Sequence, residues 1–487
     1  MPFHPTLSAA AAALRRPAAL CALAACLLAA GCASPGAPHT PLLATTPAAL
    51  GLAETASLPA PDHWWTAMGD PQLDALVAQA LQGHPSLDVA RARLARAQAL
   101  VQATGTASAP HAALQADAAR QRYTANGLVP PPIAGNVWDS ANLQIGLDWS
   151  PDFFGQHAAE LAAAVGQARA TQADAEAAAN ALAAQVSRSY VALARLLAQR
   201  EVAQSNLAQR QAMLRLTQER TQAGLDSQVE LTQAQSALPD VRTQIEALEE
   251  QITLARRQLA VLSGQAPEAQ AQLTPQLEQL AVRDVPDTLG ADLLGRRPDV
   301  VAARWRVEAA SQGVAVARTQ FYPDIHLSAF VGLNALGLGN LFNAGSRQLG
   351  VAPALRLPLF EGTRLRAQLG ARQAERDAAI AQYNGALLDA VRQAGDAMAS
   401  VQSLARQQAL QGEARAKAET AYDFAVQRYR AGLGNYLVVL NTESQLLAQR
   451  RLAVDLRARQ IDTRVQLMQA LGGGWRDDTS VVAAVAH

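Results

Sequence analysis

Residues 142–149, with the sequence NLQIGLDW, alternate polar and apolar side chains along their whole length. Residues 324–331, DIHLSAFV, repeat this alternation, and residues 348–357 follow it again. A period of two residues is typical of a β-strand in a sheet with two different faces. A fourth candidate at 112–121 has a weaker pattern, because its apolar face consists mostly of alanine. The sequence therefore predicts four strands, which form two pairs far apart in the chain.

Aromatic residues are concentrated around these strands. Of the 21 aromatic residues in the chain, ten lie within residues 109–154 and 321–360. Strands with one apolar and one polar face, and with aromatic residues near their ends, are typical of a barrel with lipid outside and water inside. A soluble sandwich with one solvated face would give a similar pattern. The two interpretations differ in the number of strands that they require.

Four strands are too few to close a barrel, because about eight is the smallest number that does so. An open sheet edge is excluded from the bilayer, since its unpaired backbone groups find no water there. If these strands cross a membrane, several chains must therefore share one barrel.

Each strand pair is followed by a very long predicted helix. Residues 157–223 contain no proline, which gives about 67 helical residues and a length of ~100 Å. Residues 363–431 repeat this length. The segment after the first long helix has apolar residues at alternating spacings of three and four, which indicates a coiled coil, although Pro239 is expected to kink it. These positions are Leu231, Ala234, Leu238, Val241, Ile245, Leu248, Ile252, Ala255, Leu259 and Leu262.

The chain also contains an internal duplication, because landmarks recur at a nearly constant offset of 207 to 213 residues. Each half is predicted to contain a helix, two strands, a very long helix and a shorter helix. A longer loop at residues 123–136 of the first half accounts for the change in offset. The paired landmarks are Pro85 with Pro298, Pro110 with Pro323, Gly155 with Gly362, Gly224 with Gly432, and Gly264 with Gly473.

The amino terminus has the three parts of an export signal. Arg15 and Arg16 precede an apolar run at 17–28, and small residues lead to Cys32. The end of this signal resembles that of bacterial lipoproteins, in which the cysteine becomes the acylated first residue. Cleavage before Cys32 would leave 487 minus 31, or 456, residues. Ala33 favours delivery to the outer membrane under the lipoprotein sorting pattern, while an ordinary signal or a single inner-membrane anchor remain the alternatives.

Composition and motifs argue against several functional classes. The 41 basic and 41 acidic residues leave no net charge, so nothing favours nucleic acid as a partner. All three cysteines lie within the first 32 residues, so the rest of the chain has neither a disulfide nor a thiolate metal site. The eight histidines are scattered, and no HExxH, G-x-S-x-G or P-loop motif occurs. We therefore expect no enzyme activity, no cofactor and no metal.

Three motifs resemble those of the TolC-like outer-membrane efflux proteins, in particular the lipoprotein branch that includes OprM and the NodT type. They are DHWWTAMGDPQLDALVAQALQGHPSLDVARARLARAQAL at 62–100, LLGRRPDVVAAR at 293–304 and RYRAGLGNYLVVL at 428–440. The resemblance covers residues 62–474, nearly all of the mature chain. It implies an α+β membrane protein in which three chains build one twelve-stranded barrel, continued by a coiled-coil helical tunnel.

The resemblance also implies a function and partners. The protein would be the outer-membrane exit channel of a tripartite efflux system, lipid-anchored in the outer membrane with its helices in the periplasm. It would form a homotrimer and receive small molecules from an inner-membrane pump, usually of the resistance-nodulation-division class, through a periplasmic adaptor. Two other classes remain open, namely a periplasmic adaptor and a structural coiled-coil lipoprotein. The internal duplication argues against the first, and the alternating strands argue against the second.

Two groups of site residues follow from the resemblance. The turns of the two helical hairpins would form the periplasmic tip where adaptors dock, and their glycines would also supply turn conformations. Tyr429, Val438 and Asn441 would lie at the periplasmic gate, where family members often place acidic residues that Val438 and Asn441 replace here. The tip turns comprise Gln222, Ala223, Gly224, Leu225 and Asp226 in the first hairpin, and Arg430, Ala431, Gly432 and Leu433 in the second.

These observations divide the chain into nine expected segments. From the amino terminus they are the signal peptide, a lipidated linker, helices of the first half, the first strand pair, the first hairpin, a linker with helices of the second half, the second strand pair, the second hairpin and a tail. Their boundaries are 1–31, 32–61, 62–108, 109–154, 155–264, 265–320, 321–360, 361–474 and 475–487.

Overall fold

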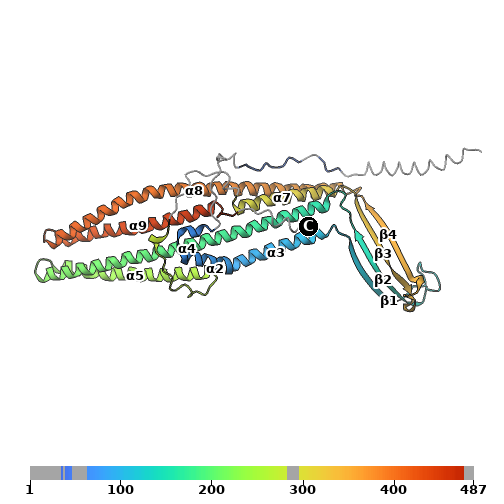
Figure 1. The fold of residues 1–487 in the computed structure, drawn as a ribbon, viewed down its shortest axis with the longest axis horizontal. Helices are drawn as coiled ribbons and strands as arrows, with labels where there is room; N and C mark the ends of the chain where they lie inside the picture. The colour runs from blue at the N-terminus through green and yellow to red at the C-terminus, as the bar shows by residue number, and fades with distance from the viewer. Residues whose placement is uncertain (1–33, 37–38, 47–62, 282–295, 476–487) are drawn as a thin grey trace, which may run out of the picture.

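The computed structural model describes residues 34–36, 39–46, 63–281 and 296–475. It consists of an elongated bundle of helices with a four-stranded sheet at one end, as Figure 1 shows. The proposed lipidation site, Cys32, lies outside the described residues.

The four predicted strands form one antiparallel sheet. They are β1 (His111–Arg122), β2 (Val137–Trp149), β3 (Asp324–Leu336) and β4 (Arg347–Arg356). Their spatial order is β1-β2-β3-β4, so the two halves of the duplication meet where β2 pairs with β3. The weak alanine-rich candidate is thus confirmed as β1. Within the described chain, β1 and β4 are the two edges of the sheet.

Two long helical hairpins form most of the bundle. The first consists of α4 (Gln156–Gln222) and α5 (Gln228–Leu262), and the second of α8 (Gly362–Arg430) and α9 (Tyr436–Ala470). The long helices contain 67 and 69 residues, which confirms the lengths expected from the absence of proline. α5 runs through Pro239 as a single helix. None of the described helices is both long and apolar enough to span a bilayer.

Shorter elements pack against the hairpins. The helices α2 (Pro71–Gly83), α3 (Pro85–Thr106) and α7 (Pro298–Thr319) each have proline in the first turn, where a missing amide hydrogen costs no helical hydrogen bond. α3 and α7 lead directly into the strands, so each half has the predicted order of elements. The 3-10 segments are η2 (Trp64–Met68), η3 (Leu277–Gln279), η4 (Leu338–Asn340) and η5 (Ala344–Ser346).

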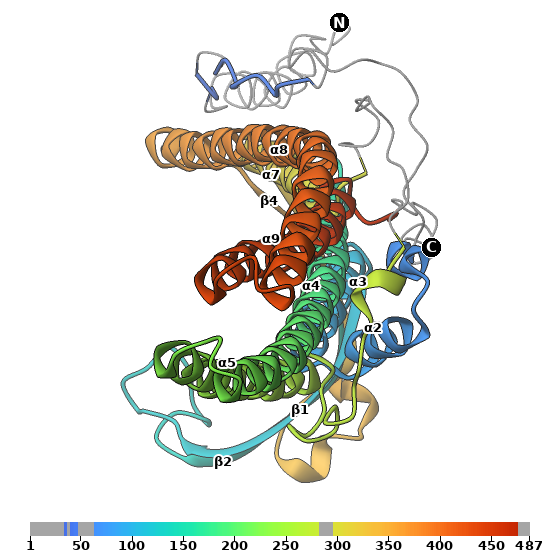
Figure 2. The ribbon, with the colours of Figure 1, turned by 90° about the vertical axis from the view of Figure 1, so that its left-hand side faces the viewer.

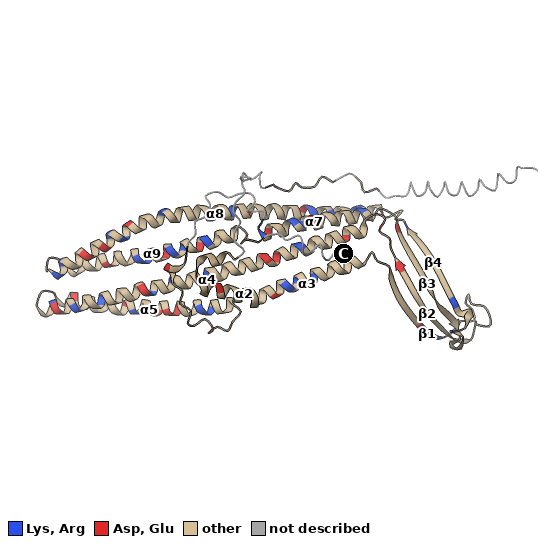
Figure 3. Cartoon of the chain, in the orientation of Figure 1, with Lys and Arg blue, Asp and Glu red and all other residues tan. Residues whose placement is uncertain are grey.

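The helices form a curved wall when the bundle is viewed along its axis (Figure 2). All ten predicted coiled-coil positions of α5 are buried or half-buried, so this seam packs against its neighbours as predicted. The largest apolar cluster joins α2, α4, α5 and α9 and contains both Trp64 and Trp65. Charged residues of both signs are spread along the helices, and the strands carry both signs as well (Figure 3).

Two of the motifs that carry the resemblance have structural roles. Trp64 donates its indole hydrogen to Asn180 at 3.2 Å and is buried in the main core. Arg297 of the RRPD motif is buried and donates to Asp299, to Gln393 and to the backbone carbonyl of Ala470, which ties the start of α7 to the end of α9. These motifs therefore hold the helices in place.

Candidate functional site at the hairpin tips

The tip turns of the two hairpins have the same backbone construction. Gly224 and Gly432 adopt φ values of +71° and +75°, which residues with a side chain rarely adopt. After each glycine, the amide of Leu225 or Leu433 donates back to the carbonyl of Arg220 or Arg428, at 2.9 Å in both turns. This hydrogen bond closes the end of a helix in a Schellman-type turn. The two turns related by the duplication therefore share the same closing hydrogen bond.

The remaining predicted tip residues lie in or beside these turns. Gln222 and Arg430 are the last residues of α4 and α8, and Ala223 and Ala431 cap those helices. Leu225 and Leu433 expose 66% and 71% of their surface. Each hairpin therefore presents an apolar side chain at its end.

A buried polar cluster connects the two hairpins just behind the turns. The Tyr429 hydroxyl on α8 donates to Asp226 Oδ2 at 2.5 Å and lies 3.1 Å from Thr217 Oγ1 on α4. Arg220 of α4 donates through Nε to Asp226 Oδ2 at 2.9 Å and through Nη2 to Oδ1 at 3.2 Å. A third guanidinium hydrogen bond reaches the backbone carbonyl of Tyr429 at 2.9 Å. We name these four residues the tip latch.

Packing largely buries the tip latch. Tyr429 is fully buried, and the Arg220 guanidinium lies 4.5 Å from its ring centroid. The ring belongs to an apolar cluster with Met213 of α4, Ala234 of α5 and Tyr436 of α9. Because charge-assisted hydrogen bonds are stronger in a dry environment, this contact stabilises the approach of the hairpins more than an exposed ion pair would.

The ionisation states of the tip latch follow from these contacts. Burial by itself raises the pKa of the Asp226 carboxyl, but hydrogen bonds from Arg220 and Tyr429 outweigh this effect and lower the pKa below its usual range. Burial and the bond to Asp226 raise the pKa of the Tyr429 hydroxyl. At neutral pH, Asp226 is therefore an anion and Tyr429 a neutral donor.

A second buried contact joins the hairpins farther from the turns. Glu443 of α9 accepts hydrogen bonds from Asn206 Nδ2 at 2.8 Å and from Arg210 Nε at 3.1 Å, both on α4. Arg210 also donates to the backbone carbonyl of Ala237 at 3.0 Å, two residues before Pro239 of α5. This network links three of the four hairpin helices. The two hairpins are therefore joined by hydrogen bonds at two places, the tip latch and the Glu443 network.

The predicted gate residues lie at the start of α9. Val438 and Asn441 are exposed one turn apart, and the amide of Val438 is capped by the Asn435 side chain at 3.1 Å. Tyr429 lies apart from them in the buried tip latch. The predicted residues thus form an exposed, uncharged surface on α9 and a buried polar contact behind it.

Sequence reasoning missed part of this site and misjudged another part. Thr217 and Arg220 were not expected to take part. Asp226 and Glu230 are the carboxylates of the first hairpin turn that could give the gate negative charge, but Asp226 is paired with Arg220, and Glu230 accepts from the amide of Ser227 in a capping box. One signal was present, since Arg220 and Asp226 flank the glycine turn at a spacing that allows them to meet.

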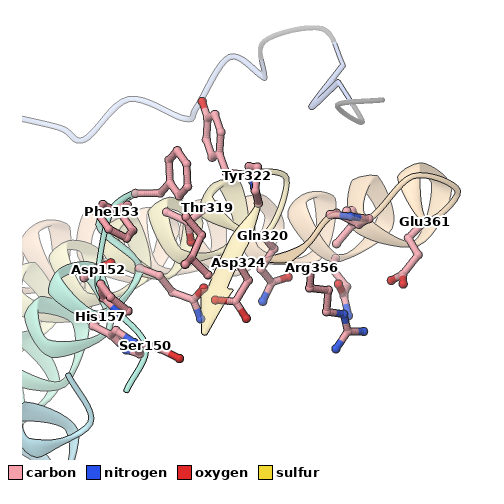
Figure 4. Close-up of a pocket in the computed structure, with 18 of the residues that line it drawn as sticks. Ser150, Asp152, Phe153, His157, Thr319, Gln320, Tyr322, Asp324, Arg356 and Glu361 are labelled. Carbon is pink, nitrogen blue, oxygen red and sulfur yellow. The ribbon is translucent and has the colours of Figure 1, made fainter. Parts of the chain in front are cut away.

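A polar hollow of about 290 Å³ lies where the sheet meets the helices. Figure 4 shows carboxylates of Asp152, Asp324 and Glu361 around it, together with His157 and Arg356. Among the described residues, no group of three or more His, Cys, Asp or Glu side chains is placed to hold a metal ion.

Comparison with known proteins agrees with this architecture. The family model described as outer membrane efflux protein matches residues 76–265 and 289–473, one match for each half of the duplication. The chain is 37% identical to the fusaric acid resistance protein FusA of Burkholderia cepacia, over 73% of this chain and 69% of that protein. It is 31% identical to the multidrug resistance outer membrane protein MdtQ of Escherichia coli, over 85% and 88% of the two chains. The crystal structure of the Vibrio cholerae outer membrane protein VceC matches with a TM-score of 0.81 and 34% identity, covering 86% of this chain and all of that one.

The fold and its long helical hairpins define an outer-membrane channel of the efflux class. The chain belongs to the outer membrane efflux protein family, as its sequence motifs predicted. Its role is that of an outer-membrane exit channel in efflux, which makes it a transport protein.

Proposed function

We propose that three copies of this chain assemble into one closed barrel of twelve strands, continued by a tunnel of helices. The observation that carries the proposal is the open sheet, in which β1 and β4 each have a strand neighbour on one side within the described chain. Unpaired edges are not tolerated in lipid, and pairing β4 of one chain with β1 of the next removes all of them. The curved wall of helices supports the same symmetry for the tunnel.

The tip latch acts as the periplasmic gate in this assembly. Separating the hairpins requires breaking the bonds that Tyr429 makes with Asp226 and Arg220. In the closed state, Val438 and its exposed apolar neighbour Leu437 line the constriction, which closes by apolar contact and dewetting. Because Val438 and Asn441 carry no charge, block of the gate by multivalent cations is weak.

The tip turns are the docking surface for a periplasmic adaptor. Leu225 and Leu433 are exposed at equivalent positions of the two hairpins, so a trimer presents six similar apolar contacts around the tunnel end. The adaptor in turn connects the channel to an inner-membrane pump of the resistance-nodulation-division class. The names of FusA and MdtQ support drugs and other small organic molecules as the cargo.

Acylation of Cys32 anchors the mature chain in the outer membrane, with the helical part in the periplasm. The proposed acyl chains lie at the amino terminus and anchor the protein in the membrane in addition to the barrel.

Outer-membrane fractionation followed by light scattering of the detergent-purified protein tests the proposal. We expect the protein in the outer-membrane fraction with a protein mass of three chains. A stable monomer that still inserts into membranes would contradict it, because such a monomer would expose open strand edges to lipid.

A further inference from the structure

The two faces of the sheet differ in chemistry. Leu114, Ile145, Val331 and Leu349 lie on one face and are each more than half exposed. The opposite face carries polar side chains at the alternate positions, including Asn142, which the register pairs with Asp117 of β1 and Asn334 of β3. Since the lipid-facing side of a membrane barrel is apolar, the polar face lines the lumen.

Hydrogen bonds order the side chains of this lumen face. Asn142 donates to Asp117 at 3.1 Å, and Gln348 of β4 donates to Asn142 at 2.8 Å. Gln348 reaches β2 across β3, because the position between them is Gly332. A methyl group at Gly332 would lie 2.6 Å from the Gln144 side chain, so glycine is needed there. The wall of the lumen is thus an ordered surface of amides and carboxylates.

On the strands, most of the arginines lie on the apolar face of the sheet, away from the lumen. The described strands contain four arginines and no lysine, and the register places Arg120, Arg122 and Arg347 on the apolar face. The fourth, Arg356, lies on the polar face at the sheet end nearest the helices, directly opposite Asp324. Asp139 also lies on the apolar face, and its Oδ1 is 3.7 Å from Nε of Arg120. Arg120 and Arg356 therefore each have a carboxylate opposite them in the sheet.

Two carboxylates on the lumen face have no arginine opposite them. The neighbours of Asp117 in the register and hydrogen-bond network are amides. Asp148 accepts from Ser328 Oγ at 3.0 Å, lies 3.3 Å from His326 Nε2 and is paired with His111 in the register. Each chain therefore contributes two such carboxylates to the lumen face, Asp117 midway along β1 and Asp148 near the end of β2 that adjoins the helices.

We infer that Asp117 and Asp148 set the ion preference of the channel, so that cations are favoured within the barrel and not at the tip. This inference rests on the proposed trimer, in which the two residues form two rings of three carboxylates. The tip residues Val438 and Asn441 supply no charge to compete with these rings. Like-charged walls enrich counter-ions in an aqueous pore. The preference depends on salt, because the Debye length falls from about 30 Å at 0.01 M to about 8 Å at 0.15 M.

Reversal potentials of single channels in a potassium chloride gradient test this inference. The double variant Asp117→Asn, Asp148→Asn keeps an amide oxygen to accept from Asn142 and Ser328, so the wall retains its hydrogen bonds. The matched control is Asp139→Asn, which removes a carboxylate from the opposite face of the same sheet. We expect the wild type and the control to prefer potassium at about 0.01 M salt, and the double variant to lose this preference.

Three outcomes would overturn the inference: no cation preference in the wild type at low salt, an unchanged preference in the double variant, or an equal loss in the Asp139→Asn control. An absence of channels altogether, in a protein that is not trimeric, would instead contradict the proposed function. The trimer mass of each variant is therefore measured beside its conductance.

Discussion

Replacing Tyr429 with phenylalanine removes one hydroxyl from the tip latch and keeps the buried ring. The lost group donates to Asp226 at 2.5 Å, across the boundary between the two hairpins. A hydrogen bond to a charged partner contributes roughly 1.5–3 kcal/mol, which corresponds to a shift of about 10- to 150-fold in the closed-to-open equilibrium for each chain. We therefore expect Tyr429→Phe to open the channel much more often than the wild type.

The assay is single-channel recording in planar bilayers, with the fraction of time spent open as the readout. Tyr436→Phe is the matched control, because Tyr436 packs in the same apolar cluster. Removing its hydroxyl leaves both partners of Asp226, Arg220 and Tyr429, in place. Asp226→Asn has a larger expected effect, since it leaves the buried Arg220 charge without its partner at a cost of about 3–5 kcal/mol. Equal open fractions for Tyr429→Phe, its control and the wild type would refute the gating role of the tip latch.

Acid should weaken the same contact. The pKa of Asp226 is lowered in the closed state, so the stabilisation is fully present above the ordinary aspartate pKa of about 3.9. It is lost as the pH falls through the lowered value, when the carboxyl becomes protonated. The open fraction of the wild type should therefore stay constant from neutral to mildly acidic pH and rise only below about pH 4. A rise between pH 7 and 5 would mean that another group controls the gate.

Three further predictions concern the gate residue Val438, the proposed lipidation site Cys32 and the buried Glu443. Val438→Asp should create a ring of carboxylates at the tip and tighten block by a trivalent cation added on the periplasmic side; tight block of the unmodified channel would show that an acidic ring already exists. Cys32→Ser should abolish incorporation of labelled fatty acid, and equal labelling of both proteins would disprove the lipid anchor. Glu443→Ala should destabilise the helical part by about 3–5 kcal/mol, because Arg210 and Asn206 lose their buried acceptor; an unchanged midpoint of thermal unfolding by circular dichroism would contradict this.

The elements of the fold could be predicted from local patterns. The alternation in 142–149 and the absence of proline in 157–223 are each visible in a short stretch of sequence, and both reflect direct geometric constraints on strands and helices. The multichain barrel could also be inferred, because the impossibility of an open sheet edge in lipid does not depend on coordinates. The duplication provided an independent check, since each element had to occur twice.

The tip latch could be predicted only in part. Tyr429 and Asp226 were recognised separately, but they are 203 residues apart and their contact depends on how the two hairpins pack. Arg220 was overlooked because a single arginine near the end of a helix is common and has a simple explanation as a favourable charge there. Side-chain pairing across distant segments leaves no periodic signal in one sequence.

Disulfide cross-linking between β1 and β4 tests the trimeric barrel most directly. Val351→Cys on β4 is combined in turn with cysteine at Ala112, Leu114, Ala116 or Ala118, which lie on the same apolar face of β1. Within one chain, these strands are separated by three strand spacings of about 4.8 Å, too far for a disulfide, which requires Cα atoms within about 7 Å. We predict that at least one pair forms a disulfide between chains in the outer membrane and gives linked dimers and trimers on denaturing, non-reducing gels. Failure of every pair to link, in a protein that is correctly inserted, would contradict a barrel closed by neighbouring copies.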